Sequence, residues 1–316
     1  MRVLIYGGGA VGLGIASCLL RRGCAVDIVA RPATVTALEA GGLVRTGIFG
    51  ESRATAGTFG AFADLTGLEG PGYDFVLVCT KSFDSAGAAE DLARHGERLG
   101  SGAALVLLQN GWGNAECFTA HFAAQRVYNA RVITGFHRHR PNEVEVTVHA
   151  DAIHVGSLFG AAVSVVEDLC RGIDEGGIPC ETSADIGRDL WAKMLYNCAL
   201  NPLGAILHVP YGALAGQTTT QALMNCIIAE VFDVMTAAGF GTHWDSPEGF
   251  IRVFYEKLVP DTAEHESSML QDISAGKCTE IDALNGAVVR LGEELGREVA
   301  HNRAMCNLIK FVERTR

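Results

Sequence analysis

The first twenty-three residues constrain the fold more than any other stretch of this chain. A short apolar run, Val3–Tyr6, is followed at once by Gly7, Gly9 and Gly12, and then by apolar residues at helical spacing as far as Gly23. This order predicts a strand, a glycine turn and a helix. Gly7 would permit the tight turn, Gly9 would let the backbone approach a pyrophosphate, and Gly12 would let the helix pack closely on the strand.

A turn of this kind predicts a dinucleotide-binding α/β domain, because the helix N-terminus offers unpaired amides to phosphate groups. A second strand, Ala25–Val29, closes the unit. The candidate phosphate-binding residues are Gly7, Gly9, Ala10, Val11 and Gly12. The same turn in another α/β protein remains an alternative, and one example is a methyltransferase that binds S-adenosylmethionine.

The end of the second strand bears on the choice of nucleotide. Asp27 lies inside the strand, and the strand ends in Ala30-Arg31. An acid at the strand end would bind the ribose hydroxyls of NADH, whereas an arginine suits the 2′-phosphate of NADPH. Arg31 therefore favours NADPH as the cofactor and disfavours a methyltransferase, which usually has an acid there. The alternative is that Arg31 is simply solvated.

Polar residues follow two further strands of the buried type. Asp74–Cys79 is followed by Thr80-Lys81, and Ala103–Leu108 is followed by Gln109-Asn110-Gly111. Open α/β sheets bind ligands beyond the carboxyl ends of their strands, so Lys81 and Asn110 are expected to face the cofactor. The alternative is that both residues only complete turns.

The chain changes its hydrophobic period near residue 184. Strands are expected before that point at Leu43–Ile48, Arg53–Thr58, Val127–Thr134, Glu143–His149, Ala152–Val155 and Ile178–Cys180, with a helix at Ala161–Glu175. Helices are expected after it at Asp185–Asn201, Gln217–Ala238, Pro247–Val259, Glu280–Leu295 and near His301–Arg314. The prediction is an α/β protein with a Rossmann-type domain over residues 1–184 and an all-helical domain over residues 185–316.

The segment His137–Arg140, which precedes Pro141, is the most basic cluster in the chain. We expect it to form a solvated hairpin loop between two strands. The alternative is a rim that attracts an anionic substrate.

The stretch Trp191–Pro202 carries the candidate chemistry of the helical half. Lys193, Asn197 and Asn201 recur every four residues, so one ammonium and two amides would share a helix face. Pro202 disfavours the helical conformation of the residue before it, and the helix is expected to stop at Asn201. On this stretch alone, an ordinary amphipathic surface helix is the alternative.

Composition narrows the partners and the compartment. The 316 residues carry a net charge of −11, which disfavours nucleic acid and anionic membranes as partners. Ten cysteines are scattered without a CxxC spacing, as expected of reduced thiols in the cytoplasm rather than of a disulfide scaffold or a zinc site. The N-terminus lacks the apolar run of a signal peptide, and no run reaches the length of a membrane span. We therefore expect a cytoplasmic protein that holds no metal.

Two later stretches complete a recognisable pattern. They are Ser267–Asp272, which reads SSMLQD, and Gly276–Gly286, which reads GKCTEIDALNG. Together with the N-terminal glycines and the W-x-K-x-x-x-N-x-x-x-N-P stretch, they resemble the ketopantoate reductase (2-dehydropantoate 2-reductase) family in order and spacing. The resemblance covers nearly the whole chain.

The resemblance implies NADPH as the hydride donor to a 2-keto acid, with the active site in a cleft between a Rossmann domain and a helical domain. It assigns Lys193 as general acid and Glu280 as a carboxylate that helps hold the substrate. It also implies that Asn110, Asn197, Asn201 and Ser268 contact substrate or cofactor, that Lys81 lies near the nicotinamide, and that Asn110 and Glu280 adjoin the cofactor. The chemistry agrees, because hydride transfer leaves charge on the carbonyl oxygen and calls for a positioned proton donor.

Glu280 is expected to open its helix, with Thr279 as the N-cap. Asp282 and Asn285 on the same helix are expected to be structural.

Three points stay open within this interpretation. The segment Thr134–Pro141 is bulkier and more basic than the small residues common in the family, so the substrate could be another 2-keto acid. A non-catalytic NADP-sensing protein is a further alternative. The expected partner is a small-molecule keto acid, and a homodimer is compatible with the sequence.

Overall fold

The computed structural model describes residues 1–70 and 72–315, which form two compact units. The first unit comprises Met1–Gln109 and Asn114–Ile186, and the second comprises Asn110–Gly113 and Gly187–Arg316. The division along the main chain falls between Ile186 and Gly187, close to the change of hydrophobic period. The short segment Asn110–Gly113 belongs to the second unit although it follows a strand of the first.

The first unit is organised around an eight-stranded sheet in the order β12-β11-β8-β7-β6-β1-β2-β5. Its strands are β1 (Arg2–Tyr6), β2 (Ala25–Val29), β5 (Gly60–Phe62), β6 (Phe75–Val78), β7 (Ala104–Leu107), β8 (Val127–Arg131), β11 (Ile153–Gly156) and β12 (Cys180–Thr182). All neighbours pair in parallel except β8 and β11, which are antiparallel. The β5-β2-β1-β6-β7-β8 portion has the strand arrangement of a Rossmann-type sheet. The predicted dinucleotide-binding architecture is therefore confirmed.

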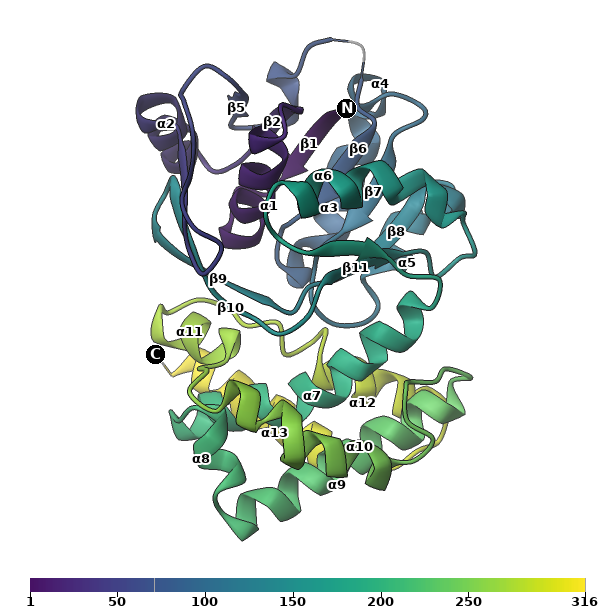
Figure 1. The fold of residues 1–316 in the computed structure, drawn as a ribbon. Helices are drawn as coiled ribbons and strands as arrows, with labels where there is room; N and C mark the ends of the chain where they lie inside the picture. The colour runs from purple at the N-terminus through teal and green to yellow at the C-terminus, as the bar shows by residue number, and fades with distance from the viewer. Residues whose placement is uncertain (71, 316) are drawn as a thin grey trace. The chain divides into compact units, whose positions relative to one another are not determined.

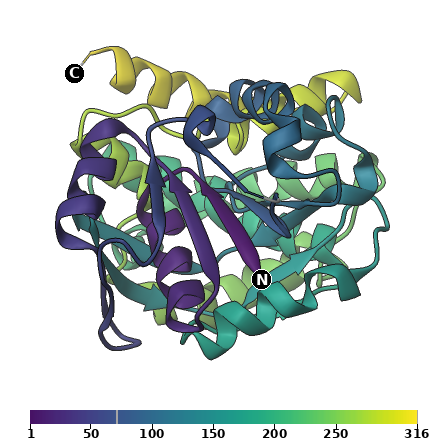
Figure 2. The same cartoon turned by 90° about the horizontal axis from the view of Figure 1, so that it is seen from above.

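Helices cover both faces of this sheet and enclose two apolar layers. They are α1 (Ala10–Arg21), α2 (Pro32–Gly41), α3 (Ser85–Arg94), α4 (Gly96–Leu99), α5 (Asn114–Thr119) and α6 (Glu167–Glu175). One layer joins the sheet to α1 and α6, and the other joins it to α3 and α5. In Figure 2, α1 in purple and α6 in teal lie on one side of the strands, and the blue helices lie on the other.

A second sheet of four strands, in the order β4-β3-β10-β9, packs its apolar side on α1. Its strands are β3 (Leu43–Gly47), β4 (Ser52–Ala54), β9 (Thr134–Arg140) and β10 (Glu143–His149). The expected hairpin loop at His137–Arg140 is therefore wrong, because these residues form strand β9 and the turn is confined to Pro141-Asn142. Pairing with β10 satisfies the backbone hydrogen-bonding groups of β9. The basic side chains of this segment do not reveal that pairing in the sequence.

Two other expected boundaries also moved. The strand expected at Arg53–Thr58 is only β4, and the edge strand expected at Ile178–Cys180 is β12, two residues further along. Element ends such as these depend on which backbone groups find partners in the sheet.

The second unit is helical apart from its turns, as predicted. Its helices are α7 (Ile186–Leu207, whose first residue belongs to the first unit), α8 (Tyr211–Ala215), α9 (Thr218–Ala237), α10 (Pro247–Val253), α11 (Ser268–Ser274), α12 (Asn285–Glu294) and α13 (Ala300–Arg314). They carry labels in Figure 1, where the ribbon runs from teal at α7 through green to yellow at α12 and α13. Among the described residues, no helix has the length and apolar character needed to cross a membrane.

Helix α7 does not stop at Asn201 as expected, because it continues through Pro202 to Leu207. Proline removes one backbone donor, and the carbonyl that loses its helical partner is that of Cys198, four residues earlier. The buried side chain of Asn285 on α12 replaces that donor, with its Nδ2 3.0 Å from the Cys198 oxygen. A tertiary contact thus allows the helix to continue where local propensity predicts an end.

Candidate active site

The glycine turn in the first unit has the close backbone packing that a dinucleotide site requires. Gly7 has φ +117°, a conformation that side chains rarely adopt. A Cβ on Gly12 would lie 2.1 Å from the carbonyl oxygen of Gly7, so helix α1 approaches strand β1 only because this residue is glycine.

Gly9 leaves open space in front of helix α1. A Cβ placed on Gly9 would meet only the Cys79 carbonyl oxygen, at 4.0 Å. Gly9 is the N-cap of α1 and has no side chain that could cap the helix. The N–H groups of Ala10 and Val11 that follow have no partner within the helix. This cradle of backbone donors fits a pyrophosphate.

Strand β2 ends as the sequence suggested. Asp27 is inside the strand, where its Oδ2 accepts hydrogen bonds from Arg2 Nη2 at 2.9 Å and from the Tyr73 hydroxyl at 2.7 Å. Arg31 is the exposed N-cap residue of α2. The carboxylate is thus engaged in a structural network, and the arginine side chain is the one at the strand end.

Lys81 and Asn110 follow adjacent strands, but they belong to different units. Lys81 follows β6 and precedes a short 3₁₀ turn in the first unit, and its carbonyl accepts a hydrogen bond from Gln109 Nε2 at 3.3 Å. Asn110 follows β7 and belongs to the second unit.

The second unit brings Asn110, Lys193 and Glu280 together. Lys193 Nζ on α7 donates to Asn110 Oδ1 at 2.6 Å, and Asn110 Nδ2 donates to Glu280 Oε2 at 3.0 Å. The amide therefore bridges an ammonium and a carboxylate that are more than 80 residues apart in sequence. Glu280 is buried, with 7% of its surface exposed. A buried carboxylate requires such donors, because its desolvation is otherwise costly.

Aromatic packing anchors Asn110 in this unit. The N–H of Trp112 donates to the carbonyl of Ala283 at 2.8 Å, next to the turn that carries Glu280. The Trp112 ring lies 4.7 Å, centre to centre, from both Trp191 and Phe240. The sequence alone predicts no role for Trp191 or Trp112. In the sequence, the only sign of this aromatic packing is Trp191, the tryptophan of the W-x-K stretch.

Glu280 does not open a helix, which corrects the expectation. Helix α12 begins at Asn285, and Glu280 lies in the preceding turn, where its carbonyl accepts from the N–H groups of Ala283 and Leu284, both at 3.1 Å. Thr279 still caps this turn, since its Oγ1 accepts from the Ile281 N–H at 3.3 Å. A single turn before α12 therefore holds the Glu280 carboxylate. The sequence did not show the break between this turn and the helix, because apolar residues recur at helical spacing through both.

The remaining predicted contact residues lie in different surroundings. Asn201 is buried, and its Oδ1 accepts from the Tyr211 hydroxyl at 2.7 Å. Asn197 is also buried, one turn beyond Lys193 on α7. Ser268 is exposed as the first residue of α11, whose N-cap is Ser267. Hydrogen bonds thus join Asn110, Lys193 and Glu280 into one cluster, and they tie Asn201 to α8.

Cys198 lies on the same helix but has no reactive character. It is fully buried, and burial raises the pKa of its thiol well above the ordinary range. The thiol therefore stays protonated and acts as a small apolar side chain.

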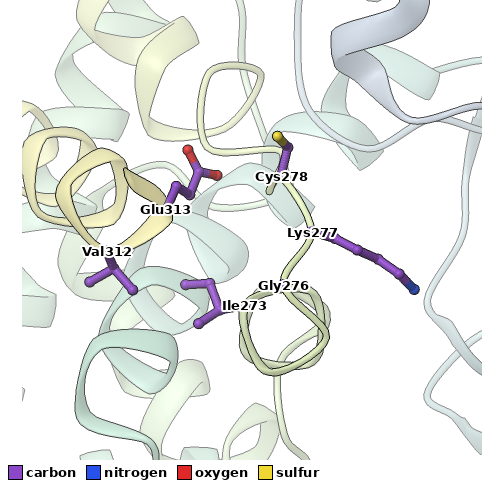
Figure 3. Close-up of a pocket in the computed structure, with 6 residues that line it drawn as sticks. All are labelled: Ile273, Gly276, Lys277, Cys278, Val312 and Glu313. Atoms are coloured by element: carbon purple, nitrogen blue, oxygen red, sulfur yellow. The ribbon is translucent and has the colours of Figure 1, made fainter. Parts of the chain in front are cut away.

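A pocket in this unit lies between the segment before Glu280 and the end of α13. It is lined by Ile273, Gly276, Lys277, Cys278, Val312 and Glu313, and the Lys277 side chain points away from it (Figure 3). Glu313 Oε1 accepts from the backbone N–H of Thr279 at 2.7 Å. None of Asn110, Lys193 and Glu280 lines this pocket, so it is not part of their cluster.

Comparisons with known proteins cover almost the entire chain. The family profile described as "Ketopantoate reductase PanE/ApbA" matches residues 3–160, and the one described as "Ketopantoate reductase PanE/ApbA C terminal" matches residues 185–313. A 2-dehydropantoate 2-reductase of Aquifex aeolicus is 35% identical over 323 residues, which covers 99% of this chain and 97% of the relative. One from Archaeoglobus fulgidus is 29% identical, covering 99% and 98%.

Solved structures agree with these matches. A PanE/ApbA family ketopantoate reductase from Ralstonia eutropha JMP134 is 31% identical with a TM-score of 0.85, covering 99% of both chains. A 2-dehydropantoate 2-reductase from Geobacter metallireducens GS-15 is 26% identical with a TM-score of 0.88, covering 98% of this chain and 99% of that one. A D-mandelate dehydrogenase solved with NADH and anilino(oxo)acetate, at 20% identity and a TM-score of 0.88 over 100% and 99%, shares the fold.

Proposed function

Because the chain belongs to the ketopantoate reductase family, we propose that it reduces 2-dehydropantoate to pantoate with NADPH, a step towards pantothenate and coenzyme A. The observation that carries the proposal is the Lys193–Asn110–Glu280 cluster. It places an ammonium, an amide and a carboxylate where one proton donor and several polar contacts can serve a keto acid. NADPH, when bound, supplies the hydride that reduces the C2 ketone.

Lys193 is the proton donor in this proposal. Charge develops on the carbonyl oxygen as the ketone is reduced, and an ammonium within hydrogen-bonding reach stabilises it and then transfers a proton. Lys193 becomes a neutral amine and recovers its proton from solvent. The 2.6 Å contact with Asn110 Oδ1 restricts the Nζ position before substrate arrives, which lowers the cost of orienting it.

Glu280 helps to hold the substrate, with its carboxylate accepting a hydrogen bond from the single hydroxyl group of 2-dehydropantoate. Asn110 Nδ2 keeps the carboxylate oriented, and the turn from Glu280 to Leu284 keeps its backbone in place. Asn197, Asn201 and Ser268 remain proposed contacts on the basis of the family resemblance, and Lys81 remains a proposed neighbour of the nicotinamide. The structure makes Asn201 the least available of these, because Tyr211 already donates to its amide oxygen.

The preference for NADPH rests on Arg31. The glycine cradle fits a dinucleotide, and the exposed guanidinium at the end of β2 suits a 2′-phosphate. Arg31→Ala should therefore weaken NADPH binding much more than NADH binding. Equal affinities of the wild-type protein for the two nucleotides would contradict this part of the proposal.

We place the reaction in the cytoplasm, since none of the ten cysteines, all of them among the described residues, forms a disulfide, and a reducing compartment suits such thiols.

The activity test is NADPH oxidation with 2-dehydropantoate, with shorter and bulkier 2-keto acids, and without substrate. A high kcat/KM on 2-dehydropantoate supports the proposal. Turnover of another acid alone would assign a different substrate, which the unusual β9 segment leaves open. Binding of NADPH with no turnover of any acid would indicate a sensor.

Lys193→Ala tests the catalytic role. Loss of a general acid should lower kcat by about 10²- to 10⁴-fold and leave NADPH affinity near that of the wild type. Lys193→Arg keeps the charge but is a poor proton donor, so it should also be slow. Lys257→Ala is the matched control, because Lys257 is an exposed lysine on the π-helical segment Phe254–Leu258 that follows α10. Unchanged turnover in Lys193→Ala would refute the assignment.

A further inference from the structure

Strand β9 brings one residue of the basic segment onto the glycine turn. Phe136 and Arg138 are two residues apart on β9 and pair with Val146 and Val144 of β10. A Cβ on Gly14 of α1 would lie 2.3 Å from the Phe136 ring, so this strand packs directly on the helix that follows the turn. All of these residues belong to the first unit.

Arg138 contacts the turn itself. Its Nη1 donates to the carbonyl oxygen of Gly8 at 3.1 Å and to Thr34 Oγ1 at 3.4 Å. Gly8 is the residue between the first two glycines of the motif, and Thr34 lies in the first turn of α2, whose N-cap is Arg31. Two arginines therefore lie by the turn that joins β2 to α2.

In the described part of the chain, no acid neutralises this pair of arginines. Within residues 1–70 and 72–315, neither Arg31 nor Arg138 makes an ion pair with a carboxylate, whereas Arg140 on the same strand pairs with Glu143. Burial and the neighbouring charge of Arg31 both lower the pKa of the Arg138 guanidinium. Two cations placed together without a counter-ion repel each other, and an anion between them would remove that cost.

We propose that Arg138 and Arg31 together bind the 2′-phosphate of the cofactor, which makes Arg138 a second residue that selects NADPH over NADH. In a dinucleotide site the adenosine ribose lies near the end of the second strand, beside the glycine turn. A phosphate monoester there carries up to two negative charges and three acceptor oxygens, which matches two guanidinium groups. This inference rests on the proposed use of NADPH.

The two arginines contribute differently. Arg31 is exposed, and solvent and salt screen its charge. Arg138 is half-buried and held at Nη1 by Gly8 and Thr34, and its Nε and Nη2 have no protein partner among the described residues. Because these two contacts already restrict the Arg138 side chain, it loses less conformational entropy when the phosphate binds. Each of its hydrogen bonds to the phosphate therefore contributes more to the binding free energy.

The test compares the Kd of NADPH with that of NADH by titration calorimetry, using wild type, Arg138→Gln and Arg140→Gln. Glutamine at 138 keeps a polar side chain on β9 and removes the charge, and an unchanged NADH affinity reports that the hairpin stays in place. Arg140→Gln makes the same charge change on an exposed residue of the same strand. Arg138→Gln should weaken NADPH by about 10- to 100-fold and NADH by less than about threefold. Arg140→Gln should leave both values within about twofold.

The adenosine half of the cofactor provides a second measurement that needs no hydride chemistry. 2′,5′-ADP carries the 2′-phosphate and 5′-AMP lacks it, so Arg138→Gln should weaken the first and spare the second. If Arg138→Gln weakens NADPH and NADH equally, Arg138 only positions the glycine turn and the proposal is overturned. An unchanged preference for NADPH would overturn it as well.

These results separate the two proposals. A wild-type protein that reduces the keto acid and prefers NADPH, with a preference that Arg138→Gln does not change, defeats only the role of Arg138. A wild-type protein with no preference for NADPH defeats the proposed cofactor itself, and the role of Arg138 with it.

Discussion

The contact between Asn285 and the Cys198 carbonyl should decide whether helix α7 tolerates Pro202. Proline cannot donate to that carbonyl, and Asn285 Nδ2 donates instead at 3.0 Å. The same amide nitrogen also donates to Asn302 Oδ1 at 3.0 Å. Asn285 and Asn302 are fully buried, so water cannot replace the lost donor.

Asn285→Ala leaves two buried acceptors without this donor. Each unsatisfied acceptor costs about 1–3 kcal/mol, and the two terms need not add fully, so we expect a loss of about 3 kcal/mol in the free energy of unfolding. The loss should fall when Pro202→Ala is introduced first. The alanine introduced by that substitution has a backbone N–H that can donate to the Cys198 carbonyl, and only the Asn302 contact then remains to be lost. The expected coupling energy is about 1–2 kcal/mol.

Urea denaturation of the four proteins in this cycle, followed by tryptophan fluorescence, measures the coupling. The three tryptophans, Trp112, Trp191 and Trp244, all lie in the second unit, so their signal reports the unfolding of that unit. A probe confined to one unit matters because a chain of two units need not unfold in one step. An equal cost of Asn285→Ala in both backgrounds would refute the idea that Asn285 compensates for Pro202.

Three further predictions concern single groups. Asn110→Ala removes the oxygen that accepts the hydrogen bond from Lys193 Nζ, and it should lower kcat/KM by about 10- to 100-fold in the keto acid assay; wild-type rates would show that the amide does not orient the ammonium. Burial alone would raise the pKa of Glu230, but backbone and side-chain donors at the start of α13 lower it below its ordinary range. The carboxylate should therefore stabilise the fold above about pH 4.3, and the stability gap between wild type and Glu230→Gln, measured by urea denaturation, should shrink as the pH falls further. An iodoacetamide mass map of the native protein should show the exposed Cys226 modified long before the buried Cys198, and equal rates would contradict the raised pKa of the Cys198 thiol.

The dinucleotide-binding half could be predicted well because its signals are local. Gly7 needs a positive φ and Gly12 needs the absence of a Cβ, and both needs are visible as glycines at fixed spacing after an apolar run. The resemblance to the family predicts Lys193 and Glu280 as site residues, and in the structure both form hydrogen bonds with Asn110. Their contacts could not be predicted from spacing, because hydrogen bonds between distant segments leave no periodic pattern.

The sequence by itself determined the strand, turn and helix at the N-terminus, the parallel sheet that follows from it, and the helical character of the second half. Those properties come from steric limits on the backbone and from the periodic burial of apolar side chains. Only the tertiary structure decided that Pro202 lies inside a helix, that Glu280 lies in a single turn before one, and that Arg138 reaches the glycine turn from strand β9. Each of these depends on a hydrogen-bond partner far away in the chain, and such partners become neighbours only when the chain has folded.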